Sequence, residues 1–412
     1  MLKWLKLRKS GFWGGFIILI RTLGGLGMQK FVAILYGPAG TTLLSHFQNL
    51  ISLFNQPIQD TVVQGFINAY PKDSFSKNKL MATAIGFTIL IFLSTLFLLW
   101  ILKAFPTDLF NFSSQNWGFI LMAILFLCLQ GIASAVLIAK QKLKLLGVLQ
   151  LLQWIIIFTF LFILSGGIEE TLQYYLYIQG MFTFIFIGVL YRDLLTFLPL
   201  SFTQDKEILN HFKQFLWMAL AVWISSKWVD FFIREYAINL FGSTETGYWQ
   251  SIVRISEAYR ALFVSFLFLT FYPVISRLYH KSRDKMKVHF RKQVKILGFF
   301  TALFFILVFV FRAPIITMLY SSEYLQATPL FKFQILGDIL AFASFPFALM
   351  LMVSVQTKKY ILCELLSAFI FIIYIFAGNS IGIEILVYAH ILRFVFYFTL
   401  VVFFTRKNWS FA

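Results

Sequence analysis

The chain has 412 residues, of which 60% are hydrophobic and 13% charged, and its mean hydropathy is +0.82. Soluble domains carry about a quarter charged residues, so this composition excludes a soluble protein and predicts an integral membrane protein. The formal net charge of +18 would suit nucleic-acid binding, but the basic residues lie in short loops between apolar segments. That placement is typical of membrane proteins, so no nucleic-acid partner is expected.

Segments of about 20 apolar residues, long enough for a helix to cross a bilayer, recur along the whole chain. The first segment follows a basic start, but Arg21 interrupts it and no small-residue cleavage site follows. We therefore interpret it as an uncleaved span and not as a signal peptide. The first half of the chain has six predicted spans, at residues 12–35, 41–67, 81–104, 117–139, 145–165 and 171–191. The second half has six more, at residues 213–237, 245–273, 292–312, 329–355, 360–378 and 383–404.

Lysine and arginine gather in every second connection between these spans, and acidic residues gather in the short connections on the other side. Basic loops of membrane proteins stay on the cytoplasmic side, so this alternation predicts an even number of spans and two cytoplasmic termini. The basic connections lie at residues 72–79, 140–144, 192–213, 277–295 and 358–359.

The polar interruption at residues 192–212 divides the spans six and six. A faint echo supports this division, because the first span of each half ends near a glycine, Gly37 and Gly242, which would allow a tight turn. Duplicated six-helix halves around a central site are a common transporter plan. We therefore predict an all-α integral membrane protein of about twelve transmembrane helices, in two six-helix bundles (residues 1–200 and 201–412) around a central cationic cavity.

Eight cationic side chains lie within the predicted spans, apart from five at span ends that belong to the flanking connections (Lys103, Lys213, Lys292, Lys295 and Arg312). A charge at the centre of a membrane helix costs about 2.5 to 3.5 kcal/mol on insertion scales unless it faces a cavity or a partner. Several cations together therefore indicate a wet, positive chamber that suits an anionic substrate. The eight residues are Arg21, Lys30, Lys227, Arg234, Arg254, Arg260, Lys332 and Arg393.

Five of these cations are predicted to bind the anionic head group of the substrate. Four of the five are arginines, whose guanidinium groups match phosphate oxygens. The remaining three, Lys30, Lys332 and Arg393, lie near span ends or can extend to the interface, so a plain interfacial role is at least as well supported. The predicted head-group set is Arg21, Lys227, Arg234, Arg254 and Arg260.

Acidic residues share helix faces with several of these cations. Asp60, Asp230, Glu257 and Asp338 are candidates for ion coupling, because a carboxyl group in a site of low dielectric can carry a proton. The alternative is that each acid only neutralises a neighbouring base. On helical spacing, Asp230 would then pair with Lys227 or Arg234, and Glu257 with Arg254 or Arg260.

Two histidines within the spans, His46 and His390, are weaker candidates, and a hydrogen-bonded packing role is favoured for each. Cys128 and Cys363 lie in apolar spans and are interpreted as core residues. No nucleotide-binding glycine motif and no metal-spaced cluster is found, so we expect no cofactor, no metal and no catalytic residue. A membrane glycosyltransferase or polymerase and a small-molecule exporter of the multidrug type stay open as alternatives.

Several sequence blocks resemble the Wzx polysaccharide flippases, the translocases of O-antigen and enterobacterial common antigen lipid intermediates. The most specific block is Gly-Tyr-Trp-Gln-Ser-Ile at 247–252 followed by Ile-Ser-Glu-Ala-Tyr at 255–259. Further matches are Tyr-Gly-Pro-Ala-Gly at 36–40, Gln-Ile-Leu-Gly-Asp-Ile at 334–339 and Ile-Leu-Cys-Glu at 361–364. The resemblance extends from the first predicted span to the eleventh.

This resemblance implies the fold of the multidrug/oligosaccharidyl-lipid/polysaccharide exporter superfamily and alternating access across the bacterial inner membrane. The implied substrate is an undecaprenyl-diphosphate-linked oligosaccharide, moved from the cytoplasmic to the periplasmic leaflet with the help of an ion gradient. The expected partners are this lipid-linked oligosaccharide, membrane lipid, and the polysaccharide polymerase and chain-length machinery of the same pathway. The resemblance assigns no coupling residue.

Overall fold

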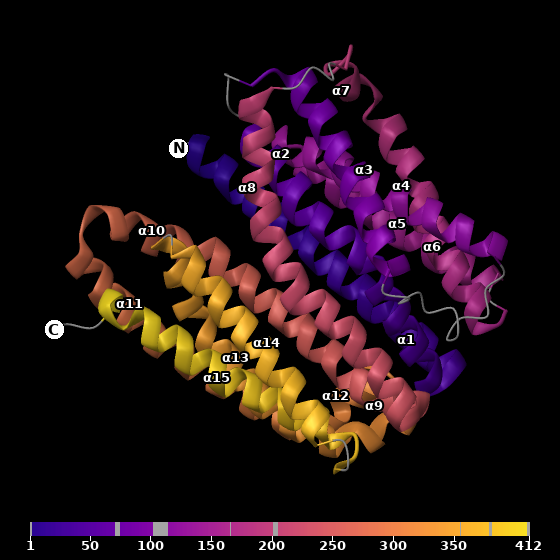
Figure 1. The fold of residues 1–412 in the computed structure, drawn as a ribbon, viewed down its shortest axis with the longest axis vertical. Coiled ribbons are helices and arrows are strands. Elements are labelled where there is room, and N and C mark those ends of the chain that lie inside the picture. The colour runs from indigo at the N-terminus through magenta and orange to yellow at the C-terminus, as the bar shows by residue number, and fades with distance from the viewer. Residues whose placement is uncertain are drawn as a thin grey trace. The chain divides into compact units, whose positions relative to one another are not determined.

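The computed structural model describes residues 2–70, 75–101, 114–164, 166–200, 205–354, 356–378 and 381–409. Within these ranges every regular element is a helix (Figure 1). The apolar segments are helical because the backbone of a helix satisfies its own hydrogen bonds, which lipid cannot do. The predicted all-α membrane class is confirmed.

In chain order, a first group of helices precedes residue 200 and a second group follows it. Short π-helical or 3-10 segments are marked η. The first group is α1 (Leu2–Ile58), η1 (Gln59–Val63), α2 (Gln64–Ala69), α3 (Lys77–Ile101), α4 (Ser114–Ala139), α5 (Leu143–Leu164), α6 (Ile168–Val189) and α7 (Tyr191–Leu195). The second group is α8 (Lys206–Val222), η2 (Trp223–Trp228), α9 (Val229–Phe266), η3 (Leu267–Phe271), α10 (Tyr272–Lys281), α11 (Arg283–Val310), α12 (Arg312–Leu319), η4 (Ser322–Ala327), α13 (Thr328–Val353), α14 (Thr357–Ala377) and α15 (Glu384–Trp409).

In the described ranges, nine continuous helical segments are long and apolar enough to cross a membrane. The first of them, Trp13–Ala69, contains two of the predicted spans, which meet at a kink in α1. The predicted spans at 213–237 and 245–273 are helical as well, but they fall on the more polar run from α8 to α10. The predicted number of about twelve spans therefore corresponds to nine apolar segments, one of which is double, and two polar spans.

Two glycines mark the kinks in the long helices. Gly37 has φ 63° and ψ −162° inside α1, and Gly242 has φ 81° and ψ 168° inside α9. A side chain at either position would be strained, because residues other than glycine rarely adopt a positive φ. The tight turns expected at these two glycines are present.

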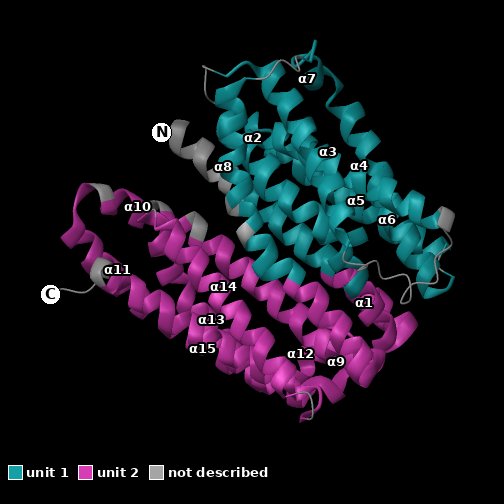
Figure 2. Ribbon diagram, in the orientation of Figure 1, with its two compact units in different colours: residues 1–25, 46–228 teal, residues 26–45, 229–412 magenta. Residues whose placement is uncertain are grey.

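The chain divides into two compact units (Figure 2). Unit 1 comprises residues 1–25 and 46–228, and unit 2 comprises residues 26–45 and 229–412. These ranges differ from a simple division at residue 200, because the segment 26–45 groups with the C-terminal helices while α8 and η2 group with the N-terminal ones.

Helices α4, α5 and α6 pack together in unit 1. Their core includes Leu137, Leu146 and Phe186, none of which is more than 1% exposed. Other side chains on the same helices are polar amides, and these line a cavity inside the unit.

Helix α7 is held to the turn between α4 and α5 by one carboxylate. Lys142 Nζ lies 2.6 Å from one carboxylate oxygen of Asp193, and Lys140 Nζ lies 3.1 Å from the other. The hydrogen bond from Lys142, followed by that from Lys140, lowers the pKa of Asp193 below its ordinary value. The predicted basic connection at 140–144 thus also has a structural role.

Helix α13 lies at the core of unit 2, where it packs against α9, α11, α14 and α15. Gly337 permits the contact with α15, because a Cβ at this position would lie 2.2 Å from the His390 ring. The same close approach places the polar residues of α13 against those of α15. It therefore brings the carboxylate of Asp338 within reach of His390.

Candidate functional site

Unit 1 contains a polar cavity of about 470 Å³ among its apolar helices. One arginine and a set of carboxamide side chains line it, together with smaller and apolar residues. The carboxamide residues are Asn55, Gln56, Gln59, Gln130, Gln150, Gln153 and Gln179. Helices α1, α4, α5 and α6 and the π-helical segment η1 all contribute to this set.

Arg21 is the charged residue of this cavity. Its Nε donates to Gln150 Oε1 at 3.1 Å, and no carboxylate of the described residues lies within ion-pair distance of its guanidinium. The Arg21 charge is therefore held in place by an amide and is not neutralised by an acid from this part of the chain. A guanidinium in this state can bind an anion.

The amides of the cavity bond to one another. Gln130 Nε2 donates to Gln153 Oε1 at 3.1 Å, and Gln59 Nε2 donates to Asn55 Oδ1 at 3.3 Å. Each primary amide carries two N–H donors and a carbonyl acceptor, so these pairs leave groups of both kinds for a ligand. The cavity can therefore bind hydroxyl groups, which both donate and accept.

Two more of the predicted residues lie in unit 1. Asp60, in η1, accepts a hydrogen bond from Gln56 Nε2 at 2.8 Å. The positive charge of Lys227, in η2, interacts electrostatically with the carboxyl group of Asp60. Helical spacing within one span could not relate Asp60 to Lys227, because the two residues lie on segments far apart in the sequence.

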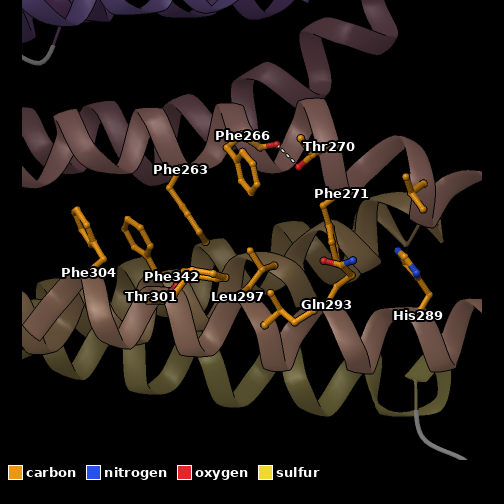
Figure 3. Close-up of a pocket in the computed structure, with 13 residues that line it drawn as sticks. Phe263, Phe266, Thr270, Phe271, His289, Gln293, Leu297, Thr301, Phe304 and Phe342 are labelled. Atoms are coloured by element: carbon orange, nitrogen blue, oxygen red, sulfur yellow. Dashed lines mark hydrogen bonds between the residues drawn. The ribbon is translucent and has the colours of Figure 1, made fainter.

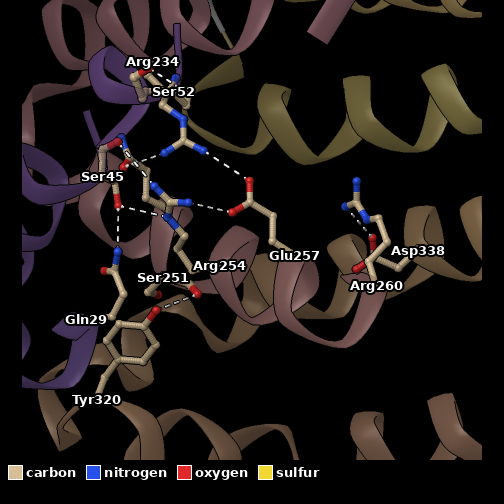
Figure 4. A network of polar contacts seen from close by, with 12 residues as sticks. Gln29, Ser45, Ser52, Arg234, Ser251, Arg254, Glu257, Arg260, Tyr320 and Asp338 are labelled. Carbon is tan, nitrogen blue, oxygen red and sulfur yellow. Dashed lines mark hydrogen bonds and ion pairs between the residues drawn. The ribbon is translucent and has the colours of Figure 1, made fainter. Parts of the chain in front are cut away.

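In unit 2, α9 carries a compact ion cluster (Figure 4). Arg254 Nη1 lies 2.8 Å from Glu257 Oε2, and Arg234 Nη2 lies 3.5 Å from Glu257 Oε1. Two arginines thus share one carboxylate. Arg234 is 2% exposed, whereas Arg254 is partly exposed and is the more accessible of the two.

The kinked helix α1 also contributes to this cluster through residues that belong to unit 2. Arg254 Nη2 donates to the Ser45 carbonyl oxygen at 3.3 Å, and Gln29 Nε2 donates to Ser45 Oγ at 3.4 Å. Arg234 Nη1 donates to Gln250 Oε1 at 3.3 Å. These polar partners fix both guanidinium groups, as a charge buried among apolar helices requires.

Asp338 forms a second polar centre in unit 2 and is fully buried. Ser256 Oγ donates to it at 2.6 Å, and the Tyr259 hydroxyl donates to the same oxygen. Arg260 Nη2 lies 3.5 Å and His390 Nε2 lies 3.1 Å from the other carboxylate oxygen. Helices α9, α13 and α15 therefore meet at one carboxylate.

The pairing of the acids follows the sequence-based alternatives only in part. Glu257 pairs with Arg254, as the spacing allowed, but its second partner is Arg234. Arg260 pairs with Asp338, 78 residues away, and not with Glu257. Asp230 acts on Arg234 electrostatically, but in the described residues it forms no ion pair.

Among the four weaker candidates, Arg393 stands three residues from His390 and interacts electrostatically with this member of the Asp338 centre. Lys30 Nζ donates to the Met318 carbonyl oxygen, the exposed Lys332 lies over the Phe333 ring, and Arg393 lies over the rings of Phe371 and Phe394. His46 is fully buried. Aromatic and backbone contacts of this kind suit a structural role for the three cations.

The amides that α4, α5 and α6 contribute to this cavity were not predicted from the sequence, in which the charged residues are the stronger signal. A weaker signal was present, because Gln150 and Gln153 stand three residues apart in an otherwise apolar span and therefore on neighbouring positions of one helix face. Glutamine within a membrane span is costly unless it is satisfied, so such a pair predicts a cavity or a polar interface.

Comparison with known proteins adds independent information. No family model matches the chain. The lipid III flippases of Escherichia coli (strain K12) and Shigella flexneri are each 22% identical to it over 382 residues, which cover 87% of this chain and 88% of the relative.

Several solved structures of membrane transporters are similar in fold to this chain. An inward-facing MATE family transporter of the MOP superfamily superimposes with a TM-score of 0.73 at 12% identity, covering 95% of both chains. The chain has the fold of such transporters. The lipid II flippase MurJ, in an inward closed conformation, superimposes with a TM-score of 0.68 at 15% identity, covering 98% of this chain and 88% of MurJ. The resemblance to flippases is confirmed.

Proposed function

We propose that the protein is a flippase for an undecaprenyl-diphosphate-linked oligosaccharide. It moves this substrate from the cytoplasmic to the periplasmic leaflet of the bacterial inner membrane by alternating access, with both termini in the cytoplasm. The similarity to lipid III flippases and the fold shared with a lipid II flippase support this proposal.

The observation that carries the proposal is the cavity of unit 1. Its amides offer donors and acceptors that suit sugar hydroxyls, and Arg21 offers a guanidinium that suits a phosphate oxygen and that no described carboxylate neutralises. A lipid-linked oligosaccharide carries both groups next to each other. The prenyl chain needs no polar pocket, because it can stay in the lipid.

Further contacts to the head group are proposed for Lys227 in unit 1 and for the partly exposed Arg254 and Arg260 in unit 2. The buried Arg234 instead holds Glu257 in place as a fixed charge. Asp338, where three helices meet, is the first candidate for coupling to a proton or cation gradient, with Asp60, Asp230 and Glu257 as the others. Loss or gain of charge at Asp338 would change its bonds to α9 and α15 together.

A multidrug exporter is the second candidate, because several solved structures of this fold are MATE transporters. The usual substrates of such exporters are cationic. The charge of Arg21, whose hydrogen-bond partner is a neutral amide, opposes a cationic substrate, and so does the partly exposed guanidinium of Arg254.

The deciding experiment reconstitutes the full chain in vesicles with a fluorescent oligosaccharide linked through diphosphate to undecaprenol. We expect the labelled lipid to become accessible on the opposite leaflet, faster under an imposed proton gradient, while empty vesicles show no transfer. Arg254→Ala should lose this transfer, and Lys358→Ala, which removes an exposed cation outside the cluster, should keep it.

Two outcomes would contradict the proposal. Export of a cationic dye without transfer of the labelled lipid would favour the multidrug exporter. Elongation of the oligosaccharide without a change of leaflet would favour a membrane glycosyltransferase or polymerase.

A further inference from the structure

Unit 2 contains an apolar groove of about 490 Å³ that none of the polar sites uses (Figure 3). One wall comes from the end of α9, from η3 and from the start of α10. The other wall comes from α11, with Phe342 of α13 at one end. Aromatic and small side chains line the deep part, among them Phe263, Phe266, Thr301, Phe304 and Phe342, whereas His289 and Gln293 line the other end.

The groove is accessible from the lipid side of the protein. Phe266 is 50% exposed, and Phe300 on the opposite wall is 60% exposed. Helix α11 has the lowest buried share of the nine membrane-crossing segments in the described ranges. Because exposed aromatic walls in a membrane face hydrocarbon, an apolar chain is the natural occupant of the space between them.

The deep end of the groove is closed by aromatic rings. Phe263 stacks on Phe342 with ring centroids 4.1 Å apart, and Phe304 stacks on the same ring at 6.4 Å. From Gln293 to Phe304 an α-helix rises about 16 Å, at about 1.5 Å per residue. Half of a hydrocarbon core about 30 Å thick is about 15 Å, so the apolar part of the groove matches the depth of one leaflet.

The other end of the groove is polar and basic. His289 lines it, and Lys285 and Lys292 stand four and three residues away, on the same side of α11. Both lysines are exposed, and in the described part of unit 2 neither forms an ion pair. Positive groups at the membrane surface beside an apolar groove complement a lipid that carries a phosphate.

We propose that this groove binds one acyl chain of an anionic phospholipid, whose phosphate lies against Lys285, His289 and Lys292. The length of the groove favours a leaflet phospholipid over a polyprenyl chain. A chain of about 55 carbons would be several times longer than the roughly 15 Å of one leaflet and would have to leave the groove at the rings that close it. The proposal does not depend on the transported substrate.

The test uses the full chain in nanodiscs that contain phosphatidylethanolamine and phosphatidylglycerol in equal amounts. Native mass spectrometry of the protein released from the nanodiscs then counts the lipid molecules that stay bound to it. We expect wild-type protein to retain phosphatidylglycerol and Thr301→Trp, which fills the groove, to lose it. Ala302→Trp is the matched control, because this exposed neighbour does not line the groove.

A second variant tests the charge without touching the groove. Lys285→Gln with Lys292→Gln should weaken phosphatidylglycerol retention about fivefold for each lysine removed. Lys287→Gln, on the opposite side of the helix from His289, should change it little. Equal retention in all variants, equal retention of phosphatidylethanolamine, or displacement by added undecaprenyl phosphate would each overturn the proposal.

Discussion

The polar interiors of the two units differ in how their charges are satisfied. In unit 1, Arg21 is bonded to an amide in a cavity lined by further amides. In unit 2, arginines are tied to Glu257 and Asp338 by ion pairs. An ion pair offsets the charge of both groups, whereas an amide partner leaves the charge of the arginine uncompensated. We therefore expect the first contact with the ligand in unit 1, further contacts from the partly exposed Arg254 and Arg260, and structural cohesion mainly from the ion pairs of unit 2.

The largest effect on stability is expected from substitution of Asp338. Asp338→Ala leaves Arg260 and the bonded hydroxyls of unit 2 without their acceptor, so we expect a loss of about 3–5 kcal/mol in unfolding free energy. Asp60→Ala, in unit 1, removes a carboxylate with an amide partner and should lose about 1 kcal/mol. Denaturant unfolding of both variants in detergent measures the difference. Equal losses of unfolding free energy in the two variants would contradict the proposed difference between the units.

The next effect concerns Arg21. Arg21→Gln keeps a hydrogen-bonding side chain but removes the charge, so we expect substrate affinity to fall about tenfold to a hundredfold with little change in stability. Binding of the fluorescent lipid-linked oligosaccharide measures this affinity. Arg192→Gln, at an exposed site of unit 1, is the control. A large stability loss with unchanged affinity would give Arg21 the structural role that we infer for the ion pairs of unit 2.

A smaller effect is expected from the amides. Gln153→Ala removes the acceptor of Gln130 and one contact for a hydroxyl group, which should weaken oligosaccharide binding about twofold to tenfold. Undecaprenyl diphosphate without sugar should bind to this variant as it does to wild type. If both ligands weaken equally, the amides shape the cavity and do not recognise the sugar.

The smallest effect is at Asp193, outside the spans. Its pKa is lowered in the folded state, so its contribution to stability is present above the ordinary carboxyl pKa and is lost as the pH falls through the folded pKa. Asp193→Asn should therefore be less stable than wild type by under about 1 kcal/mol at neutral pH and equally stable in strong acid. Thermal unfolding at several pH values measures this. A difference that grows toward low pH would have the wrong sign.

Hydropathy and spacing predicted the membrane class, the helices and the kink glycines, because each depends on local sequence. The ion pair of Arg254 and Glu257 could be predicted for the same reason, since residues three apart on a helix are neighbours. The contact of Arg260 with Asp338 was not, because helical periodicity gives no information about which helices pack together. The amide cavity depends on residues from several helices and on the space between them, and for that reason it required the structure.

The two kink glycines also bear on the history of the chain. Gly37 and Gly242 have nearly the same pair of backbone angles, 63° and −162° against 81° and 168°. The halves share only a few residue types near these glycines, yet this backbone conformation is open to glycine almost alone. If the halves descend from one ancestral unit, their common origin is therefore better preserved in two dihedral angles than in the neighbouring residues.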